Sequence, residues 1–202
     1  MWQALHTELA PLGLTVITVA LDKSPEDARP YIEAANPTHP SLIDTDYALA
    51  DLYNMINVPE VLWIDETGRI VRPNDAFFVD ETYKDYHGFS ATKPIAALRA
   101  WVRGEAPPLA EGIDAKPRIP DTTVQLARTH FALGWHLAKN GHGAEAEQHF
   151  VEAGKLAPHD FTIRRGSMLI RGLDPAGLDF FNMVQEWTST GNSYYVALPD
   201  LV

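Results

Sequence analysis

Apolar residues in the first hundred positions recur at two spacings, one typical of helices and one typical of strands. Residues 2–11 carry apolar side chains at helical spacing, and Gly13 follows as a helix stop. The run "LTVITVAL" at 14–21 is rich in β-branched residues and apolar on both faces, as in a strand covered by helices on both sides. The chain is therefore expected to begin with a helix and a buried strand.

Helical and extended patterns alternate up to residue 104. Ser24 and Pro25 begin a helix that we expect to be kinked or broken at Pro30. A later helix has Thr45 or Asp46 as its N-cap. The other expectations are an extended piece at 39–44, a strand at 60–65, a turn, a second and antiparallel strand at 69–73, a loop at 74–91 and a helix at 92–103.

A proline-rich stretch separates two halves with different patterns. We expect residues 105–121 to be a linker because prolines cluster there. Residues 1–104 form the α/β domain, residues 122–190 are helical, and residues 191–202 are a tail without an assigned element. Four helices fit the second half, at about 122–140, 143–156, 160–172 and 176–189.

The composition limits the chemistry that these 202 residues can perform. The formal net charge is −11, and an acidic chain repels phosphate backbones, so we expect no nucleic-acid partner. No run of about 18 apolar residues occurs, so we expect no membrane-spanning segment. The absence of cysteine excludes disulfides and thiolate catalysis within these residues. The residues after Met1 do not resemble a signal peptide, and any targeting segment would lie upstream, so no compartment is assigned.

Four stretches of the first half resemble the thioredoxin-like redoxins, and most closely the disulfide reductases of the TlpA/ResA type and their peroxiredoxin relatives. They are "VALD" at the end of the first strand, "PSLID" before the middle helix, "YNMINVP", and "VLWIDETGRIV". The resemblance covers about residues 2–103 and implies a thioredoxin-like fold, with a central mixed sheet and helices on both faces. It also implies thiol–disulfide oxidoreductase or antioxidant activity for the intact family member.

In that family the proline that matches Pro59 is cis, and the residue before it offers its backbone to an extended substrate segment. The resemblance therefore implies a substrate groove formed by Asn57, Val58, Pro59 and Glu60. We also expect Pro59 to pack beside the helix at 2–11.

The family's catalytic W-C-x-x-C, and the first strand that precedes it, have no counterpart in this sequence. Both would precede Met1, and the missing strand would separate the strands at 14–21 and 60–65. Two explanations are open. Either the sequence is an incomplete chain, or the protein starts at Met1 and fills the slot by rearrangement or with a partner's strand. As given, the chain is expected to show no disulfide reductase activity and to self-associate through its unpaired edges.

The second half resembles the tetratricopeptide repeat. The matching residues are Leu133, Gly134, Leu137, Ala146, Phe150, Ala153 and Pro158. Small residues allow two helices to cross closely, larger apolar residues fill the gap, and proline ends the second helix. His130 stands where the family has an aromatic residue, and residues 160–189 would supply a degenerate second helical pair. Repeats of this type usually bind peptides, and the alternative is that these helices only pack on the first domain.

The remaining chemical groups are interpreted as structural. His130 and His136 are not spaced as ligands on one helical turn, and the same holds for His142 and His149, so we expect no metal site. We expect no cofactor and no catalytic residue in this chain. Aromatic residues at 77–89 either pack on the core or form a lid beside Pro59. Two functions remain: a thiol–disulfide oxidoreductase whose cysteines lie upstream, or a non-catalytic module that binds a protein or peptide partner.

Overall fold

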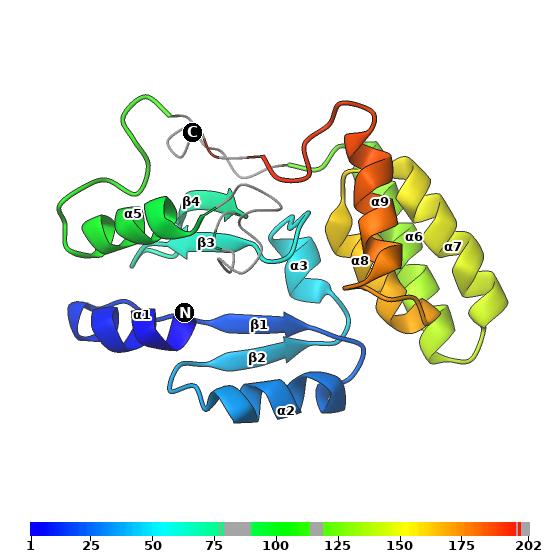
Figure 1. The fold of residues 1–202 in the computed structure, drawn as a ribbon, viewed down its shortest axis with the longest axis horizontal. Coiled ribbons are helices and arrows are strands. Elements are labelled where there is room, and N and C mark those ends of the chain that lie inside the picture. Colours follow the sequence, from blue (N-terminus) through cyan, green and yellow to red (C-terminus); the bar gives the residue numbers. More distant parts are fainter. Residues whose placement is uncertain (77, 79–89, 114–118, 197, 199–202) are drawn as a thin grey trace.

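The computed structural model describes residues 1–76, 78, 90–113, 119–196 and 198. Strands and helices alternate up to residue 102, and from residue 122 the elements of the described residues are all helices (Figure 1). The chain is therefore a mixed α/β protein whose second half is helical. In Figure 1 the second half stands beside α3 (Ala48–Leu52) of the first half.

The first sheet is a parallel pair of strands. β1 (Thr18–Leu21) pairs with β2 (Ser41–Asp44), and α2 (Pro25–Ala35) is the crossover between them. Of the kink or break expected at Pro30, the break is wrong, because α2 continues through this residue. Pro30 lies inside the helix and removes one backbone hydrogen bond, and here the following turns remain helical.

The second sheet is an antiparallel hairpin, as predicted. β3 (Val61–Ile64) pairs with β4 (Ile70–Asp75), which runs two residues into the expected loop. The carboxylate of Asp65 closes the turn by accepting hydrogen bonds from the backbone N–H groups of Thr67 and Arg69, at 2.9 and 3.0 Å. The turn is therefore held by local side-chain chemistry of the kind that short loops use.

Two helices cover this hairpin. They are α1 (Trp2–Leu9), which continues into the 3₁₀ helix η1 (Ala10–Leu12), and α5 (Thr92–Val102). The shared buried cluster consists of Leu5, Leu9, Trp63, Phe78 and Leu98. The aromatic residue at 78 thus packs on the core, whereas the others expected at 77–89 lie outside the described residues.

The two sheets are separate. Among the described residues no strand pairs with the second edge of β1 or with the second edge of β3. The single central sheet that the resemblance implies is therefore divided into two pairs. A neighbouring strand satisfies the backbone N–H and C=O groups along a strand edge, and none of the described segments supplies such a strand between β1 and β3. β1 also begins at Thr18, four residues later than predicted.

The N-cap of α3 differs from the prediction. Neither Thr45 nor Asp46 is the cap residue, because Tyr47 occupies that position in a left-handed conformation with φ of 59°. The carboxylate of Asp44 accepts hydrogen bonds from the N–H groups of Ala48 at 3.1 Å and of Leu49 at 2.8 Å. The turn at Tyr47 thus brings a carboxylate from the end of β2 onto the helix start, where it satisfies free N–H groups.

The helices of the second half agree with the predicted ranges to within two residues. They are α6 (Thr122–Lys139), α7 (Gly143–Leu156), α8 (Phe161–Arg171) and α9 (Leu178–Thr188). Asp121 and Asp160 cap α6 and α8 by accepting hydrogen bonds from Val124 N and Ile163 N, at 2.9 and 3.3 Å. No helix in the described part of the chain has both the length and the apolar character that a membrane span requires.

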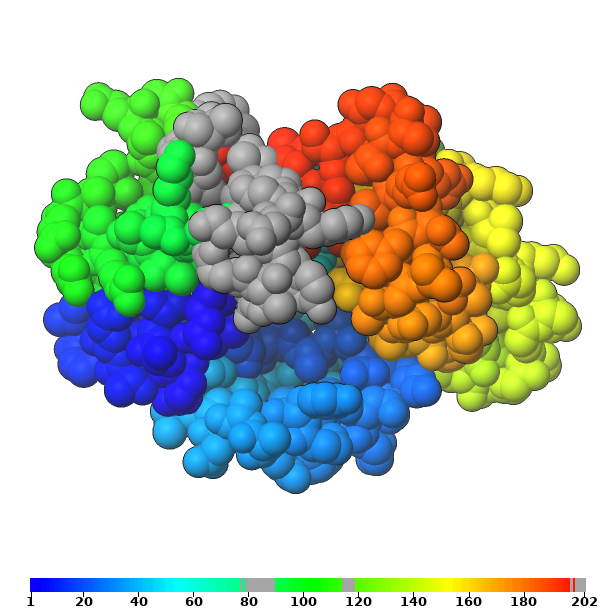
Figure 2. Space-filling view, viewed as in Figure 1, coloured from blue at the N-terminus to red at the C-terminus, as the bar shows by residue number. Residues whose placement is uncertain are grey.

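The second half packs directly on α3. Tyr47 and Ala50 share one buried cluster with Phe131 and Trp135 of α6. Gly166 of α8 permits this close approach, because a Cβ atom there would lie 2.7 Å from the ring of Tyr47. Between the blue residues of the first half and the orange residues of α8 and α9, the surface is hollowed (Figure 2). The structure therefore agrees with the interpretation that these helices pack on the first domain.

Candidate functional site

The segment Asn57–Glu60 lies in the loop between α3 and β3. The Val58–Pro59 bond is cis, as predicted. Asn57 is buried, whereas Val58 is 37% exposed and Pro59 is exposed. The carboxylate of Glu60 accepts hydrogen bonds from Ile56 N at 2.9 Å and from Asn57 N at 3.3 Å. The loop is thus closed on itself, with the side chains of Val58 and Pro59 on its outer side.

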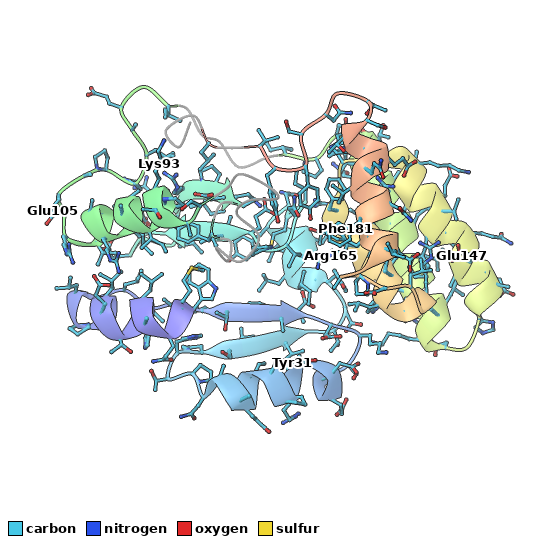
Figure 3. The ribbon with its side chains drawn as sticks, in the orientation of Figure 1. Tyr31, Lys93, Glu105, Glu147, Arg165 and Phe181 are labelled. Carbon is cyan, nitrogen blue, oxygen red and sulfur yellow. The ribbon has the colours of Figure 1, made fainter. Side chains whose placement is uncertain are left out.

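The backbone of this segment is already hydrogen-bonded within the chain. Val58 N donates to Asn57 Oδ1 at 2.9 Å, and Val58 O accepts from Arg165 Nη1 at 3.4 Å. The side-chain amide of Asn57 donates from Nδ2 to Tyr194 O at 3.2 Å. Arg165 extends from α8 toward α3 (Figure 3). The helical half and the segment after it therefore contact the loop that the resemblance identifies as a groove.

Arg128 of α6 connects the loop between α3 and β3 to the helical half by hydrogen bonds. Its Nε donates to Asp160 Oδ2 at 3.2 Å, its Nη1 to Asn54 Oδ1 at 2.8 Å, and its Nη2 to Met55 O at 3.3 Å. Arg128 and Asp160 are both buried. Burial raises the pKa of Asp160 above its ordinary value, and the Arg128 guanidinium opposes that rise.

The residues that match the tetratricopeptide repeat lie mostly at the contact between α6 and α7. A Cβ atom on Gly134 would lie 3.0 Å from the ring of Phe150 and 3.1 Å from Ala146 O, so the glycine allows the two helices to cross closely. Ala153 is buried and Leu137 is partly buried in the same cluster.

Two of the matching positions lie elsewhere. Leu133 is 44% exposed, so it contributes little to this packing. Pro158 follows the end of α7, and its carbonyl oxygen accepts from Arg164 Nη1 at 2.9 Å. His130, at the position of the family's aromatic, contacts His149 of α7 with an Nδ1–Nδ1 distance of 2.8 Å. No group of three or more metal-ligating side chains occurs in the described ranges.

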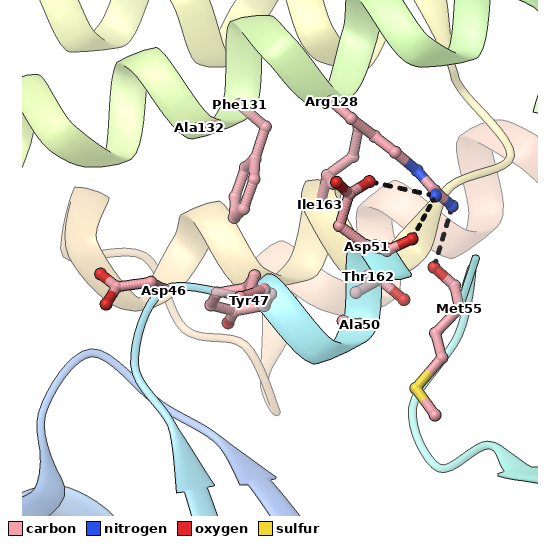
Figure 4. A pocket seen from close by; sticks show the side chains of 11 residues that line it. Asp46, Tyr47, Ala50, Asp51, Met55, Arg128, Phe131, Ala132, Thr162 and Ile163 are labelled. Atoms are coloured by element: carbon pink, nitrogen blue, oxygen red, sulfur yellow. Dashed lines mark hydrogen bonds and ion pairs between the residues drawn. The ribbon is translucent and has the colours of Figure 1, made fainter. Parts of the chain in front are cut away.

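A pocket of about 240 Å³ lies where α3, α6 and α8 meet (Figure 4). Its apolar walls include Ala50, Phe131 and Ile163, which are all buried. Tyr47 also lines it, and burial raises the pKa of this phenol above its ordinary value. The pocket is separate from the Asn57–Glu60 segment, because none of those four residues lines it.

Sequence reasoning did not identify the contacts of Arg128 and Asp160. A signal was present, because Arg128 lies three and seven residues before Phe131 and Trp135 and so shares the buried face of α6. An arginine within an apolar helical stripe indicates a buried partner of opposite charge. Its partner stands 32 residues away in the sequence, at the cap of another helix, and spacing alone cannot supply that contact.

Comparisons with protein-family models, with curated proteins and with solved structures gave no match to this chain.

Proposed function

We propose that residues 1–104 form a thioredoxin-like redoxin domain and that the chain binds an extended polypeptide segment at Asn57–Glu60. In this proposal residues 1–202 act as a non-catalytic binding module. Thiol–disulfide exchange needs a thiolate, and the sequence contains no cysteine. Oxidoreductase activity is the second candidate function, proposed only for a protein in which cysteines precede these residues.

The order and direction of the strands are the observation that supports the domain assignment. A parallel pair with a helical crossover precedes an antiparallel hairpin, and α1 and α5 pack on that hairpin. The resemblance implies the same order of elements, with one further strand lying in the sheet between β1 and β3. Figure 1 draws β1 and β3 as the facing strands of the two sheets, each with its second edge unpaired among the described residues.

The exposure of the loop supports the binding role of Asn57–Glu60. Val58 and Pro59 offer apolar side chains to solvent at the start of β3. An extended peptide that pairs with a protein backbone forms hydrogen bonds to its backbone groups, such as carbonyls, and contacts the protein with alternate side chains. Arg165 Nη1 is 3.4 Å from Val58 O, which is a long contact, so a peptide N–H can replace it at small cost.

The helical half is assigned a supporting role in this proposal. Its helices α6 and α8 are packed on α3, and Arg128 holds the loop that leads to Asn57. The faces of α6 and α8 that contact Tyr47 and Ala50 are therefore largely covered by this chain's own residues, apart from the pocket described above. A second peptide groove on those faces is not part of the proposal.

The test is selection of displayed random peptides against the purified chain, followed by mapping of the best peptide by NMR. We expect chemical-shift changes at the backbone N–H groups of residues 56–58 and 60–62. The matched variants are Val58→Asp and Val151→Asp, because the two valines are 37% and 41% exposed. Val58→Asp should weaken binding at least about tenfold, which corresponds to about 1.4 kcal/mol, and Val151→Asp should not.

The proposal would be contradicted by a peptide that changes the chain's chemical shifts only outside residues 56–62. A peptide that binds the two valine variants equally would also contradict it. Failure to select any peptide from a library that yields binders for a control protein would also contradict it.

A further inference from the structure

A pair of histidines joins α6 to α7. The Nδ1 atoms of His130 in α6 and His149 in α7 lie 2.8 Å apart, and both residues are partly buried. The ring centroids are 5.1 Å apart, and the ring planes are tilted by 36°. Spacing along a single helix argued against a metal site, but these two potential ligand atoms come from different helices.

The short contact between the two Nδ1 atoms requires a proton between them. A neutral imidazole has one nitrogen that donates and one that accepts, so one ring carries its proton on Nδ1 and the other on Nε2. If both rings carried it on Nε2, two lone pairs would face each other across 2.8 Å and repel. A metal cation in place of the shared proton removes this repulsion, because it accepts both lone pairs. The proton on Nδ1 then moves to Nε2 of the same ring, so no net proton is released.

The distance between the two nitrogens indicates the angle at such an ion. Bonds from an imidazole nitrogen to the metal are about 2.0–2.1 Å long, so two nitrogens at a right angle stand about 2.8–3.0 Å apart. At the tetrahedral angle of Zn²⁺ they stand about 3.3–3.4 Å apart, so the rings would have to separate by about 0.5 Å. The observed 2.8 Å agrees with the right angle, which Ni²⁺ and Cu²⁺ adopt with nitrogen and oxygen ligands.

The packing of the two helices fixes the backbone positions of both histidines. Gly134, one turn after His130, meets the ring of Phe150, which directly follows His149. A Cβ atom on Gly134 would lie 3.0 Å from that ring, so the helices are already at close approach. Each histidine ring has only to turn about its side-chain bonds to direct its Nδ1 lone pair at an ion. The net charge of −11 also favours the approach of a cation.

We propose that His130 and His149 form a binding site for a divalent transition-metal ion with right-angle coordination, for which Ni²⁺ is the probe. The two Nδ1 atoms occupy neighbouring positions around the ion, which joins α6 to α7. Water occupies the other positions, because no third metal-ligating side chain joins the pair among the described residues. This site is independent of the peptide-binding proposal, because it uses no residue of Asn57–Glu60.

The test is calorimetric titration of the full chain, produced without a histidine tag, with Ni²⁺, Zn²⁺ and Mg²⁺. We expect saturable binding of one Ni²⁺ per chain, weaker binding of Zn²⁺, and none of Mg²⁺, which prefers oxygen ligands. Because the site exists only in the folded chain, Ni²⁺ should also raise the melting temperature as its concentration increases. Ni²⁺ is paramagnetic, so the amide NMR signals around His130 and His149 should broaden first.

Three variants locate the ion. His130→Gln and His149→Gln each leave one imidazole and should raise the Ni²⁺ dissociation constant at least about tenfold, since loss of a group that only supports a ligand already costs about 10–100-fold. His142→Gln is the matched control, because His142 is exposed and makes no capping hydrogen bond with its side chain at the start of α7. It should bind Ni²⁺ as the unmodified chain does.

Circular dichroism establishes that each variant is folded. If one variant of the pair does not fold, the other carries the comparison. If neither folds, the signals that Ni²⁺ broadens in the unmodified chain decide, and broadening centred away from His130 and His149 refutes the site.

Three outcomes of the titrations would overturn the proposal. The first is the absence of saturable Ni²⁺ binding to the unmodified chain. The second is equal Ni²⁺ binding by His130→Gln, His149→Gln and His142→Gln, since the ion would then be adventitious. The third is tighter binding of Zn²⁺ than of Ni²⁺, which would contradict the right-angle arrangement.

Discussion

At the scale of single residues, Arg128 is the side chain on which the contact between the two halves depends most. It is buried, and it bonds to Asp160, to Asn54 and to the carbonyl oxygen of Met55. The pairing of Arg128 with Asp160 stabilises this contact, because the Asp160 carboxylate is fully buried and would otherwise carry an uncompensated charge. Replacement of Arg128 therefore removes one partner of a buried pair and leaves two acceptors on the α3–β3 loop, Asn54 Oδ1 and Met55 O, without this donor.

Arg128→Met should lower the free energy of unfolding by about 3–5 kcal/mol, the usual cost of removing one partner from a buried ion pair. Lys155→Met is the control, because Lys155 pairs with Glu152 on the exposed face of α7 and such pairs contribute less than about 1 kcal/mol. Urea unfolding followed by circular dichroism measures both. A loss of under about 1 kcal/mol for Arg128→Met would mean that the pairing does not stabilise the contact between the halves.

At the scale of elements, α1 and α5 are joined by one carboxylate and two arginines. Glu8 accepts hydrogen bonds from Arg99 Nη2 at 2.7 Å and from Arg103 Nη2 at 3.1 Å. The hydrogen bonds from Arg99, together with the positive charges of Arg99 and Arg103, hold the pKa of Glu8 below its ordinary value. A carboxyl whose pKa is lowered on folding adds stability above its unfolded pKa, and that stability is lost as pH falls through the folded pKa.

Glu8→Gln should therefore lower the melting temperature at neutral pH by a small amount, and the difference from the unmodified chain should shrink as the pH falls below the ordinary pKa of glutamate. Thermal unfolding across this pH range measures the effect. Glu33→Gln, on the exposed surface of α2, is the control and should show no such pH-dependent difference. A Glu8→Gln difference that persists unchanged at acidic pH would show that charge is not its cause.

Comparison of the observed elements with the predicted ones shows which features the sequence could predict. The bounds of α6 to α9 followed from helical spacing and from caps such as Asp121, because these are local signals. The cap of α3 was mispredicted because Tyr47 adopts a left-handed conformation, a choice that spacing does not reveal. The cis bond before Pro59 was predicted from a resemblance. The partners of Arg128 and the pocket beside Thr162 depend on contacts between distant segments, which no local pattern contains.

At the scale of the whole molecule, the separation of the two sheets is the feature that most affects behaviour in solution. β1 and β3 each have one edge unpaired among the described residues. Two-stranded sheets are marginal in water, and unpaired edges recruit strands from other chains. The sequence of β1, "TVAL", contains neither the charged residue nor the proline that natural edge strands use against such pairing. Ile17, directly before β1, adds an apolar side chain that is 58% exposed.

We therefore expect the chain to form dimers and larger species as its concentration rises, as measured by light scattering after size exclusion. Ile17→Lys should shift the distribution toward monomer, because a lysine at a strand edge disfavours pairing between chains. Tyr31→Lys is the matched control, since it changes the net charge by the same amount on a side chain of α2 that is 79% exposed. Equal effects of the two variants would indicate that charge alone controls association. A chain that stays monomeric and melts cooperatively at about 45–65 °C, the usual range for mesophilic domains, would show that the separate sheets are stable as they stand, because each edge is then protected without a further strand.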